Sequence, residues 1–326
     1  MRDDLEHAQD GGPAASASAL PGKRDIFYES TDGLRLYAAD YGPEDAALTV
    51  LCMHGLTRNH KDFEPLIRQL DLPCRFVAVD VRGRGLSDRD PNRGYSPDVY
   101  VGDMVTLLNK LGASKVSLIG TSMGGLMAMI MSQALKDRIQ GIVLNDVGPA
   151  VNPAGVKRIA GYTSGVRTFP NWQAAADAIQ SSQHTAFPDF TGTDWMAFAR
   201  QTCRETDTGQ VEFDYDPAIT ENMDVSGPVW KINFMMWRLF GRMKHIPLLT
   251  VRGEHSDILT SSTANRMCRR HKNCRLVTVP NRGHAPMLSE PEAVSAISDF
   301  LASQIEATLT APGSQPSHQA TTAAGP

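Results

Sequence analysis

The segment Gly120-Thr121-Ser122-Met123-Gly124 sets one serine in a run of small residues. An apolar run, residues 115–119, precedes it, and a Met-rich run with helical spacing follows it. Strand, tight turn and helix in that order would expose a serine oxygen at a helix N-terminus, where the partial positive charge stabilises an alkoxide or oxyanion. Glycines suit such a turn because it leaves no room for side chains. We therefore predict that Ser122 is a nucleophile.

Polar side chains that could activate a serine follow three other apolar runs. Asp257 comes shortly after residues 246–251, and His284 comes shortly after residues 275–279. Open α/β sheets place their sites at the carboxyl ends of strands, so these side chains are expected near Ser122. Serine, aspartate and histidine in this chain order match one known order of a serine triad. Asp146, which follows residues 141–145, is the alternative acid.

The remaining candidates concern the oxyanion and the substrate pocket. After the apolar run 48–53, Gly55 would let the backbone approach a bound group, and the N–H groups of Leu56 and Met123 could then hold an oxyanion. The candidates for the substrate pocket are His54, Arg58, Trp230 and Trp237. Arg58 could bind a carboxylate through its guanidinium group.

Residues 230–243 combine aromatic and Met side chains with cations. One interpretation is an amphipathic helix on a membrane surface, and the other is a cap helix whose apolar face covers the pocket. We favour the second, because the segment directly precedes an expected core strand.

Short apolar runs alternate with helical segments along most of the chain. The expected strands are residues 25–28, 34–39, 48–53, 75–79, 115–119, 141–145, 246–251 and 275–279. The expected helices are residues 98–111, 123–136, 260–270 and 291–303. Several strands are continuously apolar, which indicates a parallel sheet covered by helices on both faces, and hence an α/β architecture.

The alternation stops between residues 148 and 245, a segment that holds all four tryptophans of the chain. A structureless loop of this length is improbable in a compact domain. Helical spacing over residues 171–182, 194–203 and 229–243 predicts instead a helical cap laid over the sheet.

These motifs resemble those of the α/β-hydrolase superfamily, in the branch with a helical cap. The similar segments are His54-Gly55 (oxyanion motif), residues 80–88 (the D-x-R-G-x-G-x-S loop), residues 120–124 (nucleophile elbow) and Gly283-His284 (histidine loop). Within the second motif, Asp80, Arg82 and Asp88 are expected to hold the loop by ion pairs and turn hydrogen bonds. The resemblance covers about residues 24–303.

The resemblance implies a mostly parallel eight-stranded sheet with an antiparallel second strand, flanked by helices, with a helical cap inserted after the sixth strand. It also implies Ser122 as nucleophile, His284 as base and Asp257 as acid; we prefer Asp257 to Asp146 because its place after the penultimate strand is the commoner one. The expected boundaries are a disordered tail over residues 1–22, a core over 23–147 and 246–303, a cap over 148–245 and a second disordered tail over 304–326.

The composition excludes several other classes of protein. The 326 residues include 32 Lys and Arg against 36 Asp and Glu, a net charge of −4, so neither a nucleic acid nor an anionic membrane is expected as a partner. The five cysteines form no C-x-x-C pair and H-E-x-x-H is absent, so we expect no disulfide framework, no structural zinc and a cytoplasmic location.

Together these features predict a serine hydrolase that needs no cofactor and cleaves a small carboxylic ester through an acyl-enzyme. Lactone hydrolysis and C–C bond cleavage of a meta-cleavage product use the same triad and stay open as alternatives. A non-catalytic α/β-hydrolase-like protein that binds a small molecule is the alternative from another class.

Overall fold

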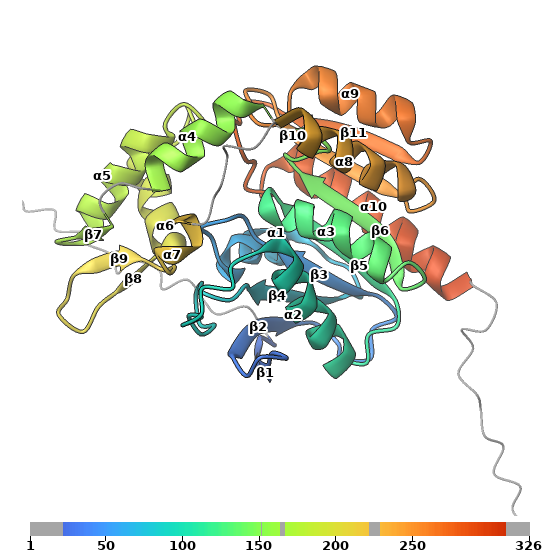
Figure 1. The fold of residues 1–326 in the computed structure, drawn as a ribbon, viewed down its shortest axis with the longest axis horizontal. Helices are drawn as coiled ribbons and strands as arrows, with labels where there is room; N and C mark the ends of the chain where they lie inside the picture. The colour runs from blue at the N-terminus through green and yellow to red at the C-terminus, as the bar shows by residue number, and fades with distance from the viewer. Residues whose placement is uncertain (1–21, 151, 164–166, 222–228, 311–326) are drawn as a thin grey trace, which may run out of the picture.

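Eight strands form one sheet through the middle of the molecule (Figure 1), in the order β1-β2-β4-β3-β5-β6-β10-β11. The computed structural model describes residues 22–150, 152–163, 167–221 and 229–310. The strands are β1 (Arg24–Glu29), β2 (Arg35–Tyr41), β3 (Thr49–Met53), β4 (Arg75–Asp80), β5 (Val116–Thr121), β6 (Ile139–Asn145), β10 (Leu248–Gly253) and β11 (Cys274–Val279). β2 runs antiparallel to both of its neighbours, and the other pairs are parallel. The predicted sheet is confirmed.

Side chains of the central strands are buried on both faces of the sheet. In β3, Leu51 and Met53 belong to one hydrophobic cluster, whereas Val50 and Cys52 belong to the other. The first cluster is completed by α2 (Pro97–Lys110) and α3 (Met123–Ala134), and the second by α1 (Glu64–Gln69) and α10 (Pro291–Thr310). A short 3-10 turn, η1 (His60–Phe63), leads into α1. Helices on both faces explain why these strands are continuously apolar in sequence.

The last helix is longer than predicted. α10 continues to Thr310, and Gln304, Ile305 and Thr308 are buried in it. The expectation of a disordered tail from residue 304 is therefore wrong for residues 304–310, because the apolar face of the helix continues along the sheet. Residues 1–21 and 311–326, where tails were also expected, lie outside the described residues.

The chain between β6 and β10 leaves the sheet after its sixth strand, at the position predicted for the cap. It forms α4 (Pro153–Thr163), α5 (Trp172–Gln183), α6 (Gly192–Thr202) and α7 (Ala218–Glu221). The cap is not purely helical, since β7 (Thr168–Phe169), β9 (Val211–Phe213) and β8 (Cys203–Glu205) form a small antiparallel sheet. A hydrophobic cluster of its own, centred on Phe187, Trp195 and Phe198, holds this unit together.

The helix α8 (Val229–Arg242) packs on the core, although we expected it in the cap. Its Phe240, together with Met243, is buried in the same hydrophobic cluster as α3. The ring of Phe240 also packs at a tilted angle against that of His271, which follows α9 (Ser261–Arg270). The predicted cap boundary at residue 245 is therefore wrong for this helix, and α8 lies beside α9 on the core (Figure 1).

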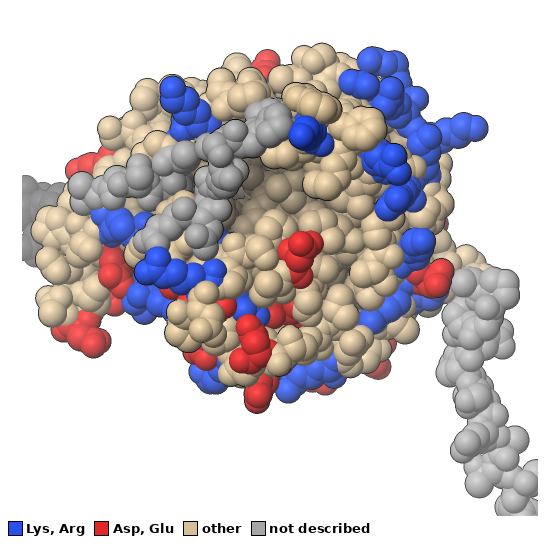
Figure 2. All heavy atoms as spheres, viewed as in Figure 1, with Lys and Arg blue, Asp and Glu red and all other residues tan. Residues whose placement is uncertain are grey.

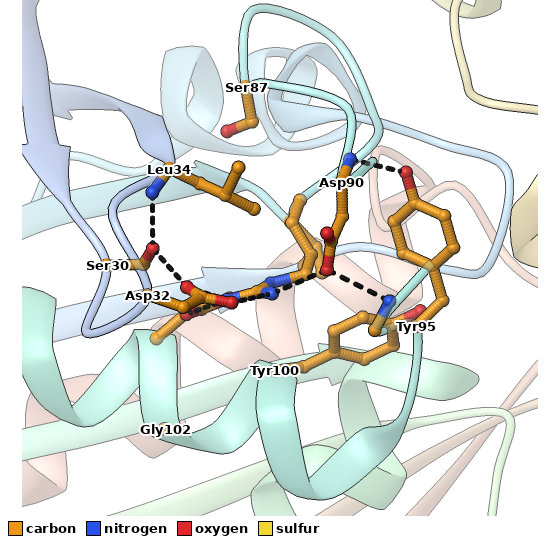
Figure 3. A network of polar contacts seen from close by, with 12 residues as sticks. Ser30, Asp32, Leu34, Ser87, Asp90, Tyr95, Tyr100 and Gly102 are labelled. Carbon is orange, nitrogen blue, oxygen red and sulfur yellow. Dashed lines mark hydrogen bonds and ion pairs between the residues drawn. The ribbon is translucent and has the colours of Figure 1, made fainter. Parts of the chain in front are cut away.

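A buried arginine fixes the loop that follows β4. Arg82 is 1% exposed and forms ion pairs with Asp103 of α2 (2.7 Å), Asp32 (2.8 Å) and Asp90 (3.0 Å). Figure 3 shows Asp32 and Asp90 pointing toward one another from two different loops, and the ion pairs of both carboxylates place the guanidinium group between them. Burying a guanidinium ion requires such partners. The expectation that Arg82 holds the loop is confirmed.

Two carboxylates of the same motif also stabilise this loop by accepting hydrogen bonds from backbone N–H groups. The Asp80 carboxylate accepts hydrogen bonds from the backbone N–H groups of His60 and Leu86, and Asp88 accepts one from Arg35 N–H. Both side chains thus hold the loop as expected.

Residues 116–135 carry no charge and form β5, a turn and α3. Across the described ranges, no helix has the length and apolarity needed to cross a bilayer. At the turn, Ser122 adopts a φ of 51°, in the left-handed region. The sharp turn brings Gly124 so close to β3 that an added Cβ would collide with the backbone carbonyl of Met53. The absent side chain at Gly124 is thus what lets α3 start against the sheet.

Replacing Gly124 by alanine should destabilise the fold by about 3 kcal/mol or more, because the backbone it would strike belongs to a central strand. Gly102→Ala is the matched control: Gly102 lies in α2 with no atom within 4 Å of an added Cβ, and alanine there should stabilise by about 0.5–1 kcal/mol. Urea denaturation measures both values. Equal stability of the Gly124→Ala variant and the parent protein would contradict this account of the turn.

Candidate active site

Three side chains from distant parts of the chain form one hydrogen-bonded relay. The Nε2 atom of His284 lies 2.9 Å from Oγ of Ser122, and Nδ1 of His284 lies 2.8 Å from Oδ2 of Asp146. Ser122 stands between β5 and α3, Asp146 follows β6, and His284 follows β11. Asp146 is fully buried and the His284 side chain is 6% exposed. This arrangement can move a proton from the hydroxyl to the imidazole, whose far nitrogen the carboxylate orients.

The structure places Asp146, the alternative acid, against His284 in place of Asp257. Asp257 forms a two-pronged ion pair with Arg158 of α4, with Oδ2 2.6 Å from Nε and Oδ1 2.8 Å from Nη2. Burial opposes ionisation of Asp257, but its hydrogen bonds to Arg158 and the charge of that arginine prevail and lower its pKa. The prediction that Asp257 orients the histidine is therefore wrong.

The position of each carboxylate explains the difference. β6 lies between β5 and β10 in the sheet, and Asp146 is the first residue after β6, so it stands directly beside the turn that holds Ser122. The loop after β10 carries Asp257 four residues beyond Gly253, the end of the strand. There it meets the cap helix α4 instead of the histidine.

The sequence interpretation missed Ser256. Its Oγ–H donates to Oδ2 of Asp146 at 2.6 Å, and the N–H of Gly253 donates to Oδ1 at 2.9 Å. Oγ of Ser256 in turn accepts from the N–H groups of Ile258 and Leu259, which leaves its own hydrogen to point at the carboxylate. Ser256 is therefore a positioning residue for Asp146. Its place in a glycine-led loop after a sheet strand was the only sequence signal available.

Of the two predicted oxyanion donors, one follows Ser122 in the chain and the other lines the same cleft. Met123 is the first residue of α3, and Ser122 provides no side-chain cap, so the N–H of Met123 belongs to the helix end that lacks intrahelical partners. Leu56 lines the same cleft as Ser122, and its carbonyl is held by Nε of Arg84 at 2.9 Å. Donation of both N–H groups to an oxyanion stays a prediction.

Ser122 and His284 open into a cleft between the core and the cap. Counted with the open solvent at its mouth, the cleft has a volume of about 1020 Å³. The cap supplies mainly apolar lining, and the core supplies most of the polar groups: the main side chains are Arg58, Ile159, Ile179, Phe187, Phe198 and Tyr215. Such a cleft suits a small molecule with an apolar body and few polar groups.

Of the four predicted pocket residues, only Arg58 lines this cleft. His54 is fully buried below it; its Nδ1 donates to the carbonyl of Gly55 and its Nε2 accepts from the N–H of Val81. Burial lowers the pKa of His54 to about 4, which keeps the ring neutral. His54 is thus a structural residue of the strand end, and its prediction as a pocket residue is wrong.

Trp230 and Trp237 lie away from the cleft because α8 packs on the core. Trp230 is 68% exposed, and Trp237 packs below the guanidinium groups of Arg266 and Arg270. Neither tryptophan is among the residues that line the cleft. The predictions for these two residues, and for α8 as a cover of the pocket, are wrong. Within the described parts of the chain, no three His, Cys, Asp or Glu side chains are grouped to hold a metal ion.

A sequence model of the alpha/beta hydrolase family matches residues 50–297. The chain belongs to the α/β hydrolase family. It is 33% identical over 273 residues to a 3-hydroxybutyrate-oligomer hydrolase from Cupriavidus necator, covering 82% of this chain and 92% of that protein. It is 26% identical over 264 residues to an esterase from Mycobacterium tuberculosis, covering 77% of this chain and 82% of that protein. The crystal structure of an α/β hydrolase from Novosphingobium aromaticivorans superposes with a TM-score of 0.80 at 39% identity, covering 88% of this chain and 99% of that one.

Replacing Asp146 by asparagine should lower kcat for a p-nitrophenyl ester by about 10³- to 10⁴-fold, because the histidine loses the carboxylate that sets its tautomer. Asp257→Asn is the matched control and should retain most of the activity, since its partner is Arg158. Steady-state kinetics of the two variants decide between the acids. A larger loss in Asp257→Asn than in Asp146→Asn would reverse the assignment.

Proposed function

We propose that this protein is a serine hydrolase that cleaves carboxylic esters through an acyl-enzyme on Ser122. The supporting observation is the relay in which His284 bridges Ser122 and Asp146 at the floor of a cleft for a small molecule. The likeness to the oligomer hydrolase and to the esterase favours ester bonds over the lactone and C–C alternatives.

The chemistry follows from the geometry. His284 takes the proton of Ser122 while the serine oxygen attacks the ester carbonyl, and Asp146 stabilises the imidazolium that forms. The N–H groups of Leu56 and Met123 hold the tetrahedral oxyanion, an effect of about 3–4 kcal/mol per donor. His284 then passes its proton to the leaving alcohol. Water, activated by His284, releases the acid product and restores the serine.

The cleft also suggests that the substrate carries a free carboxylate. The carboxylate of Asp62 accepts a hydrogen bond from Nε of Arg58 at 2.8 Å and forms an ion pair with its Nη2 at 2.7 Å. The guanidinium group also lies 4.0 Å from the ring centre of Phe198 in the cap. These contacts fix the group in place, while Nη1 has no hydrogen bond to any described residue. Arg58 can thus donate to an acidic substrate. Esters of short hydroxy acids, the class to which the oligomers in the relative's name belong, carry such a carboxylate.

Replacing Ser122 by alanine should reduce hydrolysis of short p-nitrophenyl esters by several orders of magnitude, because no nucleophile remains. A fluorophosphonate probe should label the parent protein and leave the variant unlabelled. Ser182→Ala, which removes a second hydroxyl of the cleft, is the control and should keep both activities. Absence of labelling in the parent protein would favour the non-catalytic binding protein instead.

Replacing Arg58 by glutamine should raise KM for the linear dimer of 3-hydroxybutyrate by about tenfold or more, because a charge-assisted hydrogen bond is lost. The methyl ester of the same dimer has no carboxylate and should be hydrolysed by both forms with similar constants. Arg89→Gln, an exposed arginine outside the cleft, is the matched control. An equal loss on the dimer and its methyl ester would refute the role of Arg58 while leaving esterase activity intact.

A further inference from the structure

The outward face of α8 carries large apolar side chains that nothing in the described structure covers. Trp230 is 68% exposed, Phe234 62%, Met235 61% and Ile232 43%. Among the described residues, four of the six large hydrophobic side chains with such exposure lie on this one helix. Single exposed apolar residues are ordinary, but a group of this kind marks a contact surface.

The helix itself is firmly held, so the exposed face is a lasting feature of the fold. Phe240 is 1% exposed in the core cluster, and Met236, Trp237 and Leu239 pack partly against that cluster. α8 thus buries one apolar face on α3 and presents outward a face on which apolar and basic side chains are mixed. A helix whose only task was to cover the core would carry polar residues throughout its outer face, without large exposed aromatic and aliphatic side chains among them.

Cations stand among these apolar side chains on α8 and beside them on α9. They are Lys231, Arg238, Arg242 and Lys244 on or just after α8, and Arg266, Arg269, Arg270 and Lys272 on or just after α9. The guanidinium groups of Arg266 and Arg270 lie 4.4 and 5.0 Å from the ring centre of Trp237, which joins the two helices into one surface. We call it the α8–α9 face.

No acidic residue occurs in residues 229–253 or 258–275, although the chain as a whole has a net charge of −4. Figure 2 shows Lys and Arg gathered over α9 and the C-terminal end of α8. The charge of the α8–α9 face is therefore opposite in sign to that of the whole protein, and an anionic partner complements it.

We propose that the α8–α9 face docks on an anionic lipid surface, with Trp230, Phe234 and Met235 entering the interface and the neighbouring cations contacting lipid phosphates. Amphipathic helices of this composition bind in the interfacial plane, where aromatic side chains are buried at headgroup level and each cation adds electrostatic attraction. This revises the expectation that no membrane takes part, which rested on the net charge and on the interpretation of residues 230–243 as a cap helix.

Two other occupants fit the face less well. A second copy of this chain would place the same cations opposite one another in a two-fold contact. A single-stranded nucleic acid would stack its bases on aromatic rings, but Ile232 and Met235 offer no ring. Docking leaves the cleft available, since no residue of α8 or α9 lines it.

The test is co-sedimentation of the full chain with vesicles of equal parts phosphatidylglycerol and phosphatidylcholine, compared with vesicles of phosphatidylcholine alone. We expect binding to the anionic vesicles, weaker binding when salt rises from about 0.05 to about 0.5 M, and little binding to the neutral ones. The tryptophan emission should shift to the blue on binding, and Trp230→Phe should remove most of that shift.

Substitutions test separately the basic and the apolar side chains of the α8–α9 face. Arg238→Glu should weaken binding by about fivefold or more, and Phe234→Ser should weaken it by a similar factor. Lys110→Glu, on α2, and Leu86→Ser, an exposed apolar residue elsewhere, are the matched controls and should bind as the parent protein does. Unchanged hydrolysis of a short soluble ester shows that each variant is folded.

Three results would overturn the proposal. They are absence of binding to anionic vesicles at low salt, equal binding by Phe234→Ser and the parent protein, and retention on a polyanion such as heparin without vesicle binding. A concentration-dependent dimer that Phe234→Ser abolishes would likewise assign the face to a second copy. None of these outcomes bears on the esterase proposal, whose readout is chemical.

Discussion

The close approach of α3 to β3 is the constraint on which the site depends. Gly124 lets the helix begin where a Cβ would strike the carbonyl of Met53, and this approach fixes Ser122 in its left-handed conformation. The serine oxygen then stands at the helix N-terminus, at the strand edge that also carries Asp146 and His284. A parallel sheet brings the ends of β5, β6 and β11 to one edge, so residues far apart in the chain meet there.

The chain at the end of β10 both orients the carboxylate of Asp146 and holds the cap in place. The last residue of β10, Gly253, and Ser256 in the loop that follows each donate a hydrogen bond to the carboxylate of Asp146, and Asp257 of the same loop holds the cap through Arg158. A single loop therefore orients the acid of the relay and anchors α4 over the cleft. This explains why Asp257 has a lowered pKa without touching the histidine.

The molecule has two distinct surfaces beside its core. The cap, with its own hydrophobic cluster, encloses the cleft and contributes the apolar lining. α8 and α9 form a separate face on the core, on which apolar and basic side chains are mixed. Ester hydrolysis in the cleft and binding to an anionic lipid surface would then depend on different elements. A substitution that affects one of these functions need not affect the other.

Local sequence determined the strands of the main sheet and two of the three relay residues. Apolar runs marked every strand of the main sheet, and the glycines around Ser122 and before His284 marked two turns, because burial and tight turns restrict residue types wherever they occur. The choice between Asp146 and Asp257 was made only by the order of strands in the sheet, since both carboxylates follow apolar runs. The same holds for α8, whose apolar residues look alike in sequence: packing against α3 decided which of them are buried and which are left exposed.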